Sequence, residues 1–150
     1  MLSLPLGIRV ATVEAAGDFD THDGQRQALA RDLGSVSAAL SAFQADLEAR
    51  GLADRVLTLV WTEFGRRPQE NSSGGTDHGA GGIAWVMGAR ARGGILSPYP
   101  SLGDFDREDN LKVTVDFRSV YASLLEQWLG TGADEVLPDA GRVGRLELVA

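Results

Sequence analysis

The chain has 150 residues, of which 43% are apolar and 23% charged, a composition typical of a globular protein with a buried core. The net charge of −7, from 14 basic and 21 acidic residues, argues against a nucleic-acid-binding surface, and the absence of cysteine excludes disulfides and thiolate metal ligands. No apolar run approaches the roughly 18 residues that span a bilayer, so we expect a single domain over residues 1–150 that does not span a membrane.

The first 51 residues predict a strand, a polar loop and a long helix. The opening, MLSLPLGIRV, lacks the charged and long apolar regions of a signal peptide, and residues 8–13 favour a strand. Residues 18–24 then form a loop rich in carboxylates. From about Gln25 to Arg50, apolar residues recur at steps of four and three, which indicates one helix face, and Gly51 suits the helix stop. The stripe consists of Leu29, Leu33, Val36, Leu40, Phe43 and Leu47.

Residues 56–61 form a short, nearly continuous apolar run, as in a strand covered on both faces. Together with the strand and helix before it, this run predicts a right-handed βαβ unit. Polar residues follow at once, namely Glu63, Arg66 and Arg67. Because ligands bind beyond the carboxyl ends of strands in open α/β sheets, we expect these side chains to lie near a site.

The next segment is a glycine-rich loop, Gly74-Gly75-Thr76-Asp77-His78-Gly79, after which residues 83–87 predict another strand. Glycines allow the backbone to approach a ligand closely. If the strands are parallel, this loop and the loop at residues 18–24 meet at one edge of the sheet.

The remainder predicts an irregular excursion, a strand, a helix and an edge strand. Residues 88–110 show little periodicity, and residues 111–115 alternate as in a short strand. Asp116 is expected to cap a helix that ends at Gly130. The apolar face of this helix is Phe117, Val120, Tyr121, Leu124, Leu125 and Trp128. The tail after Pro138 alternates weakly, which favours an edge strand.

Both histidines of the chain lie in the two polar loops, beside carboxylates. Asp20, His22, Glu63 and His78 are the candidate metal ligands, because imidazole and carboxylate without sulfur suit zinc, manganese or a similar divalent ion. Each residue has a simpler interpretation: a histidine can be a hydrogen-bonded loop residue, and an aspartate such as Asp20 or Asp77 a turn former. Calcium-loop, phosphate-loop and Gly-x-Ser-x-Gly motifs all fail on spacing.

Three stretches resemble the C-terminal part of an uncharacterised bacterial family of sulfatase-like proteins related to the alkaline phosphatase superfamily. They are GDFDTHDGQ with the following helix, VLTLVWTEFGRRPQENSSGGTDHG and VDFRSVYASLLEQWLG, within residues 8–130. In that superfamily, Asp20 and His22 would correspond to ligands of the first metal, which His78 would complete. Thr62-Glu63-Phe64-Gly65 falls where Thr-Asp-His-Gly of the second metal is expected, so Phe64 departs from the pattern.

The resemblance implies an alkaline phosphatase-like fold, a three-layer α/β/α domain with a mainly parallel sheet. It also implies a metal-dependent hydrolase of phosphatase or sulfatase type acting on a small ester. Arg66, Arg67 and Asp77 are then the candidates for binding the substrate. The nucleophilic Ser or Thr of the superfamily belongs to an N-terminal half that this sequence does not contain, so we expect a truncated, catalytically incomplete domain. The alternative is a non-catalytic structural or interaction domain that self-associates through an exposed sheet edge. Full-length relatives are expected to be exported.

Overall fold

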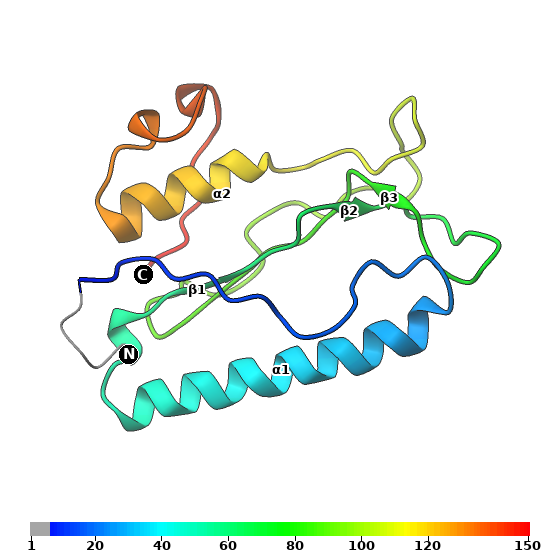
Figure 1. Cartoon of the computed structure of the whole chain (residues 1–150). Helices are drawn as coiled ribbons and strands as arrows, with labels where there is room; N and C mark the ends of the chain where they lie inside the picture. Colours follow the sequence, from blue (N-terminus) through cyan, green and yellow to red (C-terminus); the bar gives the residue numbers. More distant parts are fainter. Residues whose placement is uncertain (1–6) are drawn as a thin grey trace. The chain divides into compact units, whose positions relative to one another are not determined.

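The computed structural model describes residues 7–150, which form two compact units (Figure 1). The first unit contains the described residues up to Val56 together with Gln69–Asp77, and the second contains Leu57–Pro68 and His78–Ala150. The first six residues of the predicted non-signal opening lie outside the described part. None of the helices within residues 7–150 is both long and apolar enough to cross a membrane.

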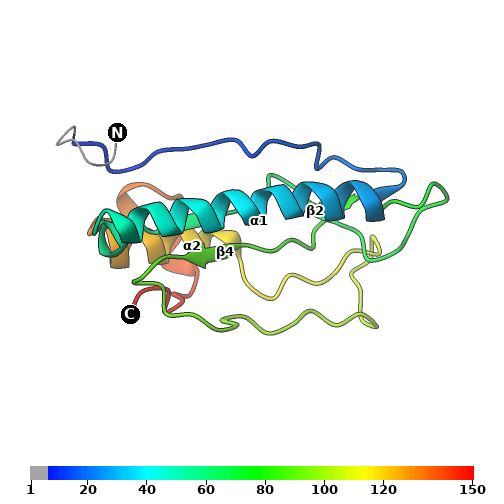
Figure 2. The same ribbon diagram turned by 90° about the horizontal axis from the view of Figure 1, so that it is seen from below.

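The first unit is built on α1, which spans Gln25–Ala49 and confirms the predicted helix (Figures 1 and 2). Its predicted apolar stripe is only partly covered: Leu47 is 2% exposed, whereas Leu33 is 38% and Phe43 36% exposed. In both views, the extended segment that precedes α1 runs back along the helix. Asp32 of α1 is buried and accepts hydrogen bonds from Arg31, which hold the pKa of its carboxyl below the usual range.

The C-terminus of α1 ends at a left-handed glycine, as predicted. Gly51 has φ +65°, a conformation that costs a residue with a Cβ atom about 1–2 kcal/mol. Its N–H donates to Glu48 O at 3.0 Å, and the N–H of Leu52 donates to Leu47 O at 2.8 Å. These two bonds satisfy carbonyls that the helix leaves open. The short 3-10 helix η1, Ala53–Arg55, follows.

The second unit contains two small antiparallel sheets. Strand β1, Thr58–Val60, pairs with β4, Trp85–Met87, with Leu59 opposite Val86. Strand β2, Gly65–Arg66, pairs with β3, His78–Gly79. A Cβ atom on Gly65 would lie 2.5 Å from Gly81 O, so only glycine allows this approach of backbones.

Helix α2, Phe117–Leu124, begins at Asp116, whose carboxylate accepts from the Arg118 N–H at 2.9 Å and confirms the predicted cap. The helix continues as the π-helix η2, Leu125–Leu129, and ends at Gly130 with φ +63°. Two 3-10 helices follow, η3 at Ala133–Glu135 and η4 at Ala140–Arg142. The buried cluster of this unit is Ala122, Ala133 and Ala140, with Leu125 and Leu137 packed against it.

The side of α2 that is buried differs from the predicted apolar face. Ser119, Ala122 and Ser123 are buried, whereas Phe117 is 68% exposed. Burial of Ser123 is tolerated because its hydroxyl donates to Ser119 O at 2.7 Å and accepts from the Leu146 N–H at 2.8 Å. The small residues let η3 and η4 approach α2 closely.

The expected three-layer α/β/α fold with a mainly parallel, alkaline phosphatase-like sheet is wrong. The strands among residues 7–150 form two antiparallel pairs, and no βαβ unit is present among them. Residues 8–13 form no strand, and Val13 is 88% exposed. The predicted strand at residues 111–115 is reduced to one bridge between Leu111 and Phe105, and the tail to one between Val149 and Ala91. A β-branched run favours an extended chain, but it does not specify a partner strand.

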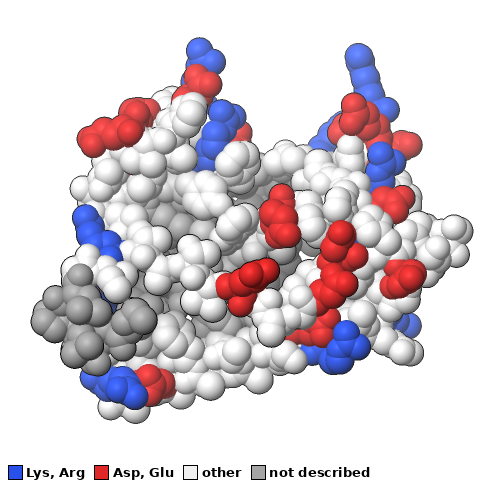
Figure 3. All heavy atoms as spheres, viewed as in Figure 1, with Lys and Arg blue, Asp and Glu red and all other residues white. Residues whose placement is uncertain are grey.

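Acidic and basic side chains are interspersed on the face of the molecule shown in Figure 3. Several charged side chains of the protein are paired, as between Arg145 and Glu126 at 2.8 Å and between Arg50 and Asp46 at 2.8 Å. Pairs of this kind at the surface contribute little to stability individually.

Candidate functional site

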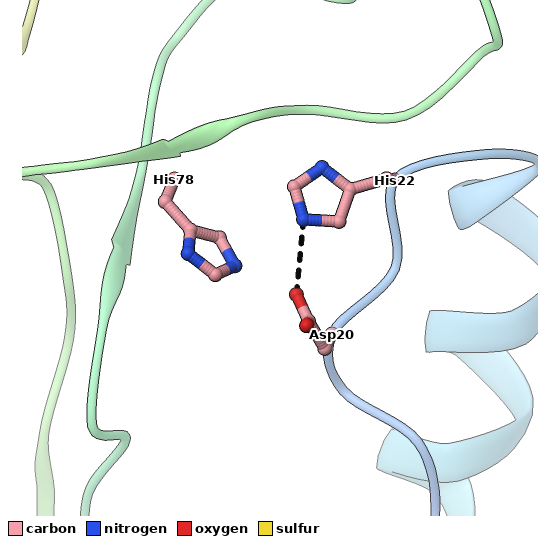
Figure 4. A group of neighbouring side chains, drawn as sticks. All are labelled: Asp20, His22 and His78. Carbon is pink, nitrogen blue, oxygen red and sulfur yellow. Dashed lines mark ion pairs between the residues drawn. The ribbon is translucent and has the colours of Figure 1, made fainter.

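The loop before α1 holds Asp20 and His22 next to each other. Asp18 Oδ1 accepts from the Asp20 N–H at 3.0 Å, which fixes the turn from which Asp20 projects. Asp20 Oδ1 lies 3.1 Å from His22 Nε2, the ion pair that Figure 4 marks with a dashed line. Both side chains are about half exposed, at 55% for Asp20 and 47% for His22. A carboxylate oxygen and an imidazole nitrogen therefore face each other where solvent ions have access.

The glycine-rich loop of the first unit supplies a third side chain to this cluster. Asp77 Oδ1 lies 3.4 Å from His22 Nδ1, so the imidazole lies between two carboxylates. The loop is held to the start of α1 by backbone hydrogen bonds at 3.0 Å, from Gly24 N to Ser73 O and from Gln25 N to Gly74 O. The two predicted loops are thus brought together, although no parallel sheet does so.

Asn71 ties the glycine-rich loop to His22. Its Oδ1 accepts from the N–H groups of Ser73 and Gly75, both at 3.0 Å. Its Nδ2 donates to His22 O at 2.9 Å and to Asp77 Oδ1 at 3.2 Å. The sequence contains a signal for this role, since Asn before Ser-Ser-Gly-Gly is typical of a side chain that closes a turn. Sequence spacing alone does not place Asn71 against His22.

Gln25, the first residue of α1, links the same two loops through its side chain. Its Nε2 donates to Thr21 Oγ1 at 3.0 Å and to Thr76 Oγ1 at 3.1 Å. Thr21 is only 8% exposed, so the residue between the two candidate ligands is part of the scaffold. Periodicity assigned Gln25 only to the start of the helix, and it gave no sign of this bridging role.

Gly75 is buried at the closest approach of the two loops. A Cβ atom here would lie 2.3 Å from both the carbonyl carbon and the oxygen of His22. Real Cβ contacts are essentially never this short. The position therefore requires glycine for steric reasons, and its N–H donates to Asn71.

In the second unit, His78 stacks on Phe64. The ring centroids are 3.9 Å apart and the planes differ by 17°. The Arg66 guanidinium lies 5.0 Å from the centroid of the Phe64 ring, and Arg66 is also the register partner of His78 in the β2–β3 ladder. Aromatic stacking of this kind restricts the orientation of the imidazole.

Asp20 and His22 of the first unit offer one carboxylate oxygen and one imidazole nitrogen to a metal ion, and His78 of the second unit is the other imidazole that the sequence predicted as a ligand (Figure 4). This donor set fits a zinc-like ion with open positions better than calcium or magnesium, which prefer oxygen alone. Glu63, the fourth predicted ligand, lies in the second unit, is exposed and is not a member of this group.

The two arginines predicted to bind substrate have contacts within the second unit. Arg66 lies over Phe64, as described above. The charge of Arg67 helps to hold the pKa of Asp106 below its usual range, although the main causes are the N–H groups of Asn110 and Glu108 that donate to that carboxylate. Both guanidinium groups therefore already interact with groups of the protein.

A hollow of about 460 Å³ lies beside the N-terminus of α2 in the second unit. It offers no cluster of histidines or hydroxyl nucleophiles. Each of its arginines has an acidic partner: Arg118 with Asp116, Arg142 with Asp139 and Arg145 with Glu126.

A family model described as "Protein of unknown function" matches residues 4–137 of the chain. No curated protein and no solved structure matches the chain.

Proposed function

We propose that this chain, which belongs to the DUF1501 family, is the metal-binding domain of a hydrolase of phosphatase or sulfatase type, with Asp20, His22 and His78 as ligands of a zinc- or manganese-like ion. The observation that carries the proposal is the position of His22, whose Nε2 lies 3.1 Å from Asp20 Oδ1 and whose Nδ1 lies 3.4 Å from Asp77 Oδ1. His78, the third proposed ligand, follows Asp77 directly in the chain.

A divalent ion held in this way would polarise an ester oxygen and activate a bound water. The residues of the chain would orient the ion: Asp20 contributes negative charge, His22 is held by its second nitrogen, and His78 is held by stacking on Phe64. The resemblance to the alkaline phosphatase superfamily supports an ester of phosphate or sulfate as the substrate, with Arg66 or Arg67 binding its oxyanion.

Metal binding is tested with zinc and manganese, by metal analysis after dialysis and by titration against a chelating indicator. We expect about one ion per chain, bound more weakly than in a closed four-ligand site. His22→Ala and His78→Ala should each weaken binding, whereas Asp23→Asn, an exposed carboxylate in the same loop, is the matched control. Because the chain has two histidines and no cysteine, no other imidazole or thiolate can contribute. Failure of the wild-type protein to bind either ion, or binding that survives both substitutions, would reject the site.

Hydrolysis is a separate question, because it needs an oxygen nucleophile. Thr21 lies between two proposed ligands, but it is 8% exposed and its hydroxyl accepts from Gln25. We therefore expect little or no turnover of an aryl phosphate or aryl sulfate by this chain alone, even with metal. Turnover that disappears in His78→Ala would show instead that these residues supply a nucleophile or a metal-activated water.

A second candidate function is a non-catalytic interaction domain, which the β1–β4 sheet favours. Among the described residues this sheet has two strands. Trp85 of β4 is 47% exposed, and Ile83, just before β4, is 64% exposed. Unpaired strand edges beside apolar side chains promote association between chains. Light scattering across a concentration series tests this: the Trp85→Lys variant should associate less than the wild-type chain at the same concentration. A wild-type chain that is monomeric throughout the series would reject self-association.

A further inference from the structure

One side of the His22 ring is held by a chain of hydrogen bonds that does not include any proposed ligand. Asn71 Nδ2 donates to Asp77 Oδ1 at 3.2 Å, and the same oxygen lies 3.4 Å from His22 Nδ1. The opposite nitrogen, Nε2, lies 3.1 Å from Asp20. All four residues belong to the first unit, so the chain of contacts is internal to it.

We propose that Asp77 is a positioning residue that selects Nε2 of His22 as the metal-binding nitrogen, and that Asn71 holds Asp77 in place for this purpose. The inference rests on the proposed metal site. A neutral imidazole has one N–H and one lone pair, and a nitrogen that binds metal must present its lone pair. If Nδ1 donates its proton to the Asp77 carboxylate, Nε2 is left to bind an ion next to Asp20. Carboxylates that orient metal-binding histidines in this way are common in metal sites.

The hydrogen bonds of Asn71 fix the direction of its amide. The oxygen must face the N–H groups of Ser73 and Gly75, because an NH₂ group there would meet two donors. The NH₂ group then faces His22 O and Asp77 Oδ1, both of which are acceptors. The same residue therefore holds the backbone of His22 and the carboxylate that orients the ring. These contacts assign Asp77 to orientation of His22, whereas the sequence offered it as a substrate-binding residue.

The first test uses the metal-free protein with Asp20→Ala, because the Asp20 carboxylate, 3.1 Å from Nε2, would itself accept a hydrogen bond from an Nε2–H. Nitrogen–proton correlation spectra at about pH 8.5, where an ordinary imidazole is neutral, report which ring nitrogen carries the proton. His78→Ala assigns the signals, since the chain has two histidines. We expect the Nδ1–H form of His22 in Asp20→Ala and a shift towards Nε2–H when Asp77→Ala is added. An unchanged tautomer on adding Asp77→Ala would overturn the proposal.

The second test measures zinc affinity in the full chain. We expect Asp77→Ala to weaken zinc binding about 10- to 100-fold, and Asp77→Asn to weaken it less, because its amide oxygen still accepts. Asn71→Asp keeps the acceptor for Ser73 and Gly75 but replaces the donor to Asp77 with a like charge, so it should lower affinity and alter the tautomer while the turn remains. Unchanged affinity in Asp77→Ala would refute the positioning role.

The two tests separate this inference from the proposed function. If the wild-type chain binds no zinc, the metal site fails, and the metal-free spectra still decide whether Asp77 sets the tautomer. If zinc binds and His22→Ala abolishes binding, but Asp77→Ala has no effect, only the positioning role fails.

Discussion

Replacement of Gly75 by alanine should disrupt the candidate site through sterics alone. The added Cβ would lie 2.3 Å from the carbonyl carbon and oxygen of His22 and 2.8 Å from the N–H nitrogen of Asp23, whereas ordinary contacts begin at 3.4 Å. All three atoms are backbone, so no side chain can rotate away. The two loops would have to separate by about 1.1 Å, a displacement taken from those contact distances.

That displacement is large compared with the hydrogen bonds it affects. The contact from His22 Nδ1 to Asp77 is already 3.4 Å long, and the bond from Gly75 N to Asn71 is 3.0 Å. Adding about 1 Å to either exceeds the range of a hydrogen bond. Overpacking in a buried place costs about 1–3 kcal/mol, and we expect the upper end here because backbone must move. Zinc affinity should fall at least tenfold, the equivalent of about 1.4 kcal/mol.

Far-UV circular dichroism during urea unfolding measures the loss in the free energy of unfolding, because α1 contributes 25 helical residues to the first unit. The matched control is Gly34→Ala, the same substitution in the same unit with nothing within 4 Å of the new Cβ. It should raise stability by roughly 0.4–1 kcal/mol, since alanine is the better helix residue, and leave zinc binding unchanged. If Gly75→Ala has the same stability and zinc affinity as the wild-type chain, the close approach of the two loops is refuted.

Three further outcomes follow from contacts within single units. Leu47→Ala should lower the free energy of unfolding by about 2–4 kcal/mol, measured by urea titration, because the side chain is 2% exposed; a loss below about 1 kcal/mol, the range of surface substitutions, would contradict its burial. Phe64→Leu should remove the ring-current shift of the His78 imidazole protons in NMR spectra, whereas Phe64→Trp should retain one; identical His78 shifts in Phe64→Leu would exclude the stack. The Arg145 guanidinium holds the pKa of Glu126 below its ordinary value. The stabilisation from this ion pair is therefore present above the ordinary glutamate pKa and is lost as pH falls through the pKa of Glu126 in the folded protein. The difference in unfolding free energy between wild type and Glu126→Gln should then shrink on acidification, and a difference independent of pH would contradict the pairing.

The helices could be predicted because their signals are local. The stripe from Leu29 to Leu47, the stop at Gly51 and the cap at Asp116 each depend on residues within a few positions of one another. The structure confirms the helix at Gln25–Ala49, its stop at Gly51 and the cap at Asp116. The buried face of α2 was missed because its burial depends on close approach of η3 and η4, which favours Ala122 and Ser123 over larger side chains.

Strand pairing could not be predicted in the same way. The runs at residues 56–61 and 83–87 do contain strands β1 and β4, but apolar character alone does not distinguish a parallel central strand from an antiparallel pair. The similar run at residues 8–13 has no partner strand among residues 7–150. Direction and partner are set by contacts between residues far apart in sequence, and a single sequence does not contain them in readable form.

Two loops of the candidate site meet as expected, but for a different structural reason. The loops at residues 18–24 and 74–79 were expected to meet because parallel strands would deliver them to one sheet edge. Within the first unit they do meet, but Asn71 and the small size of Gly75 bring the loops together instead. Since a site built by two loops depends on a few hydrogen bonds and one glycine, its geometry should be more sensitive to substitution at Asn71 and Gly75 than to changes in the β1–β4 sheet. Loss of zinc binding on disrupting the β1–β4 pair, with the first unit still folded, would argue against a site carried by these loops.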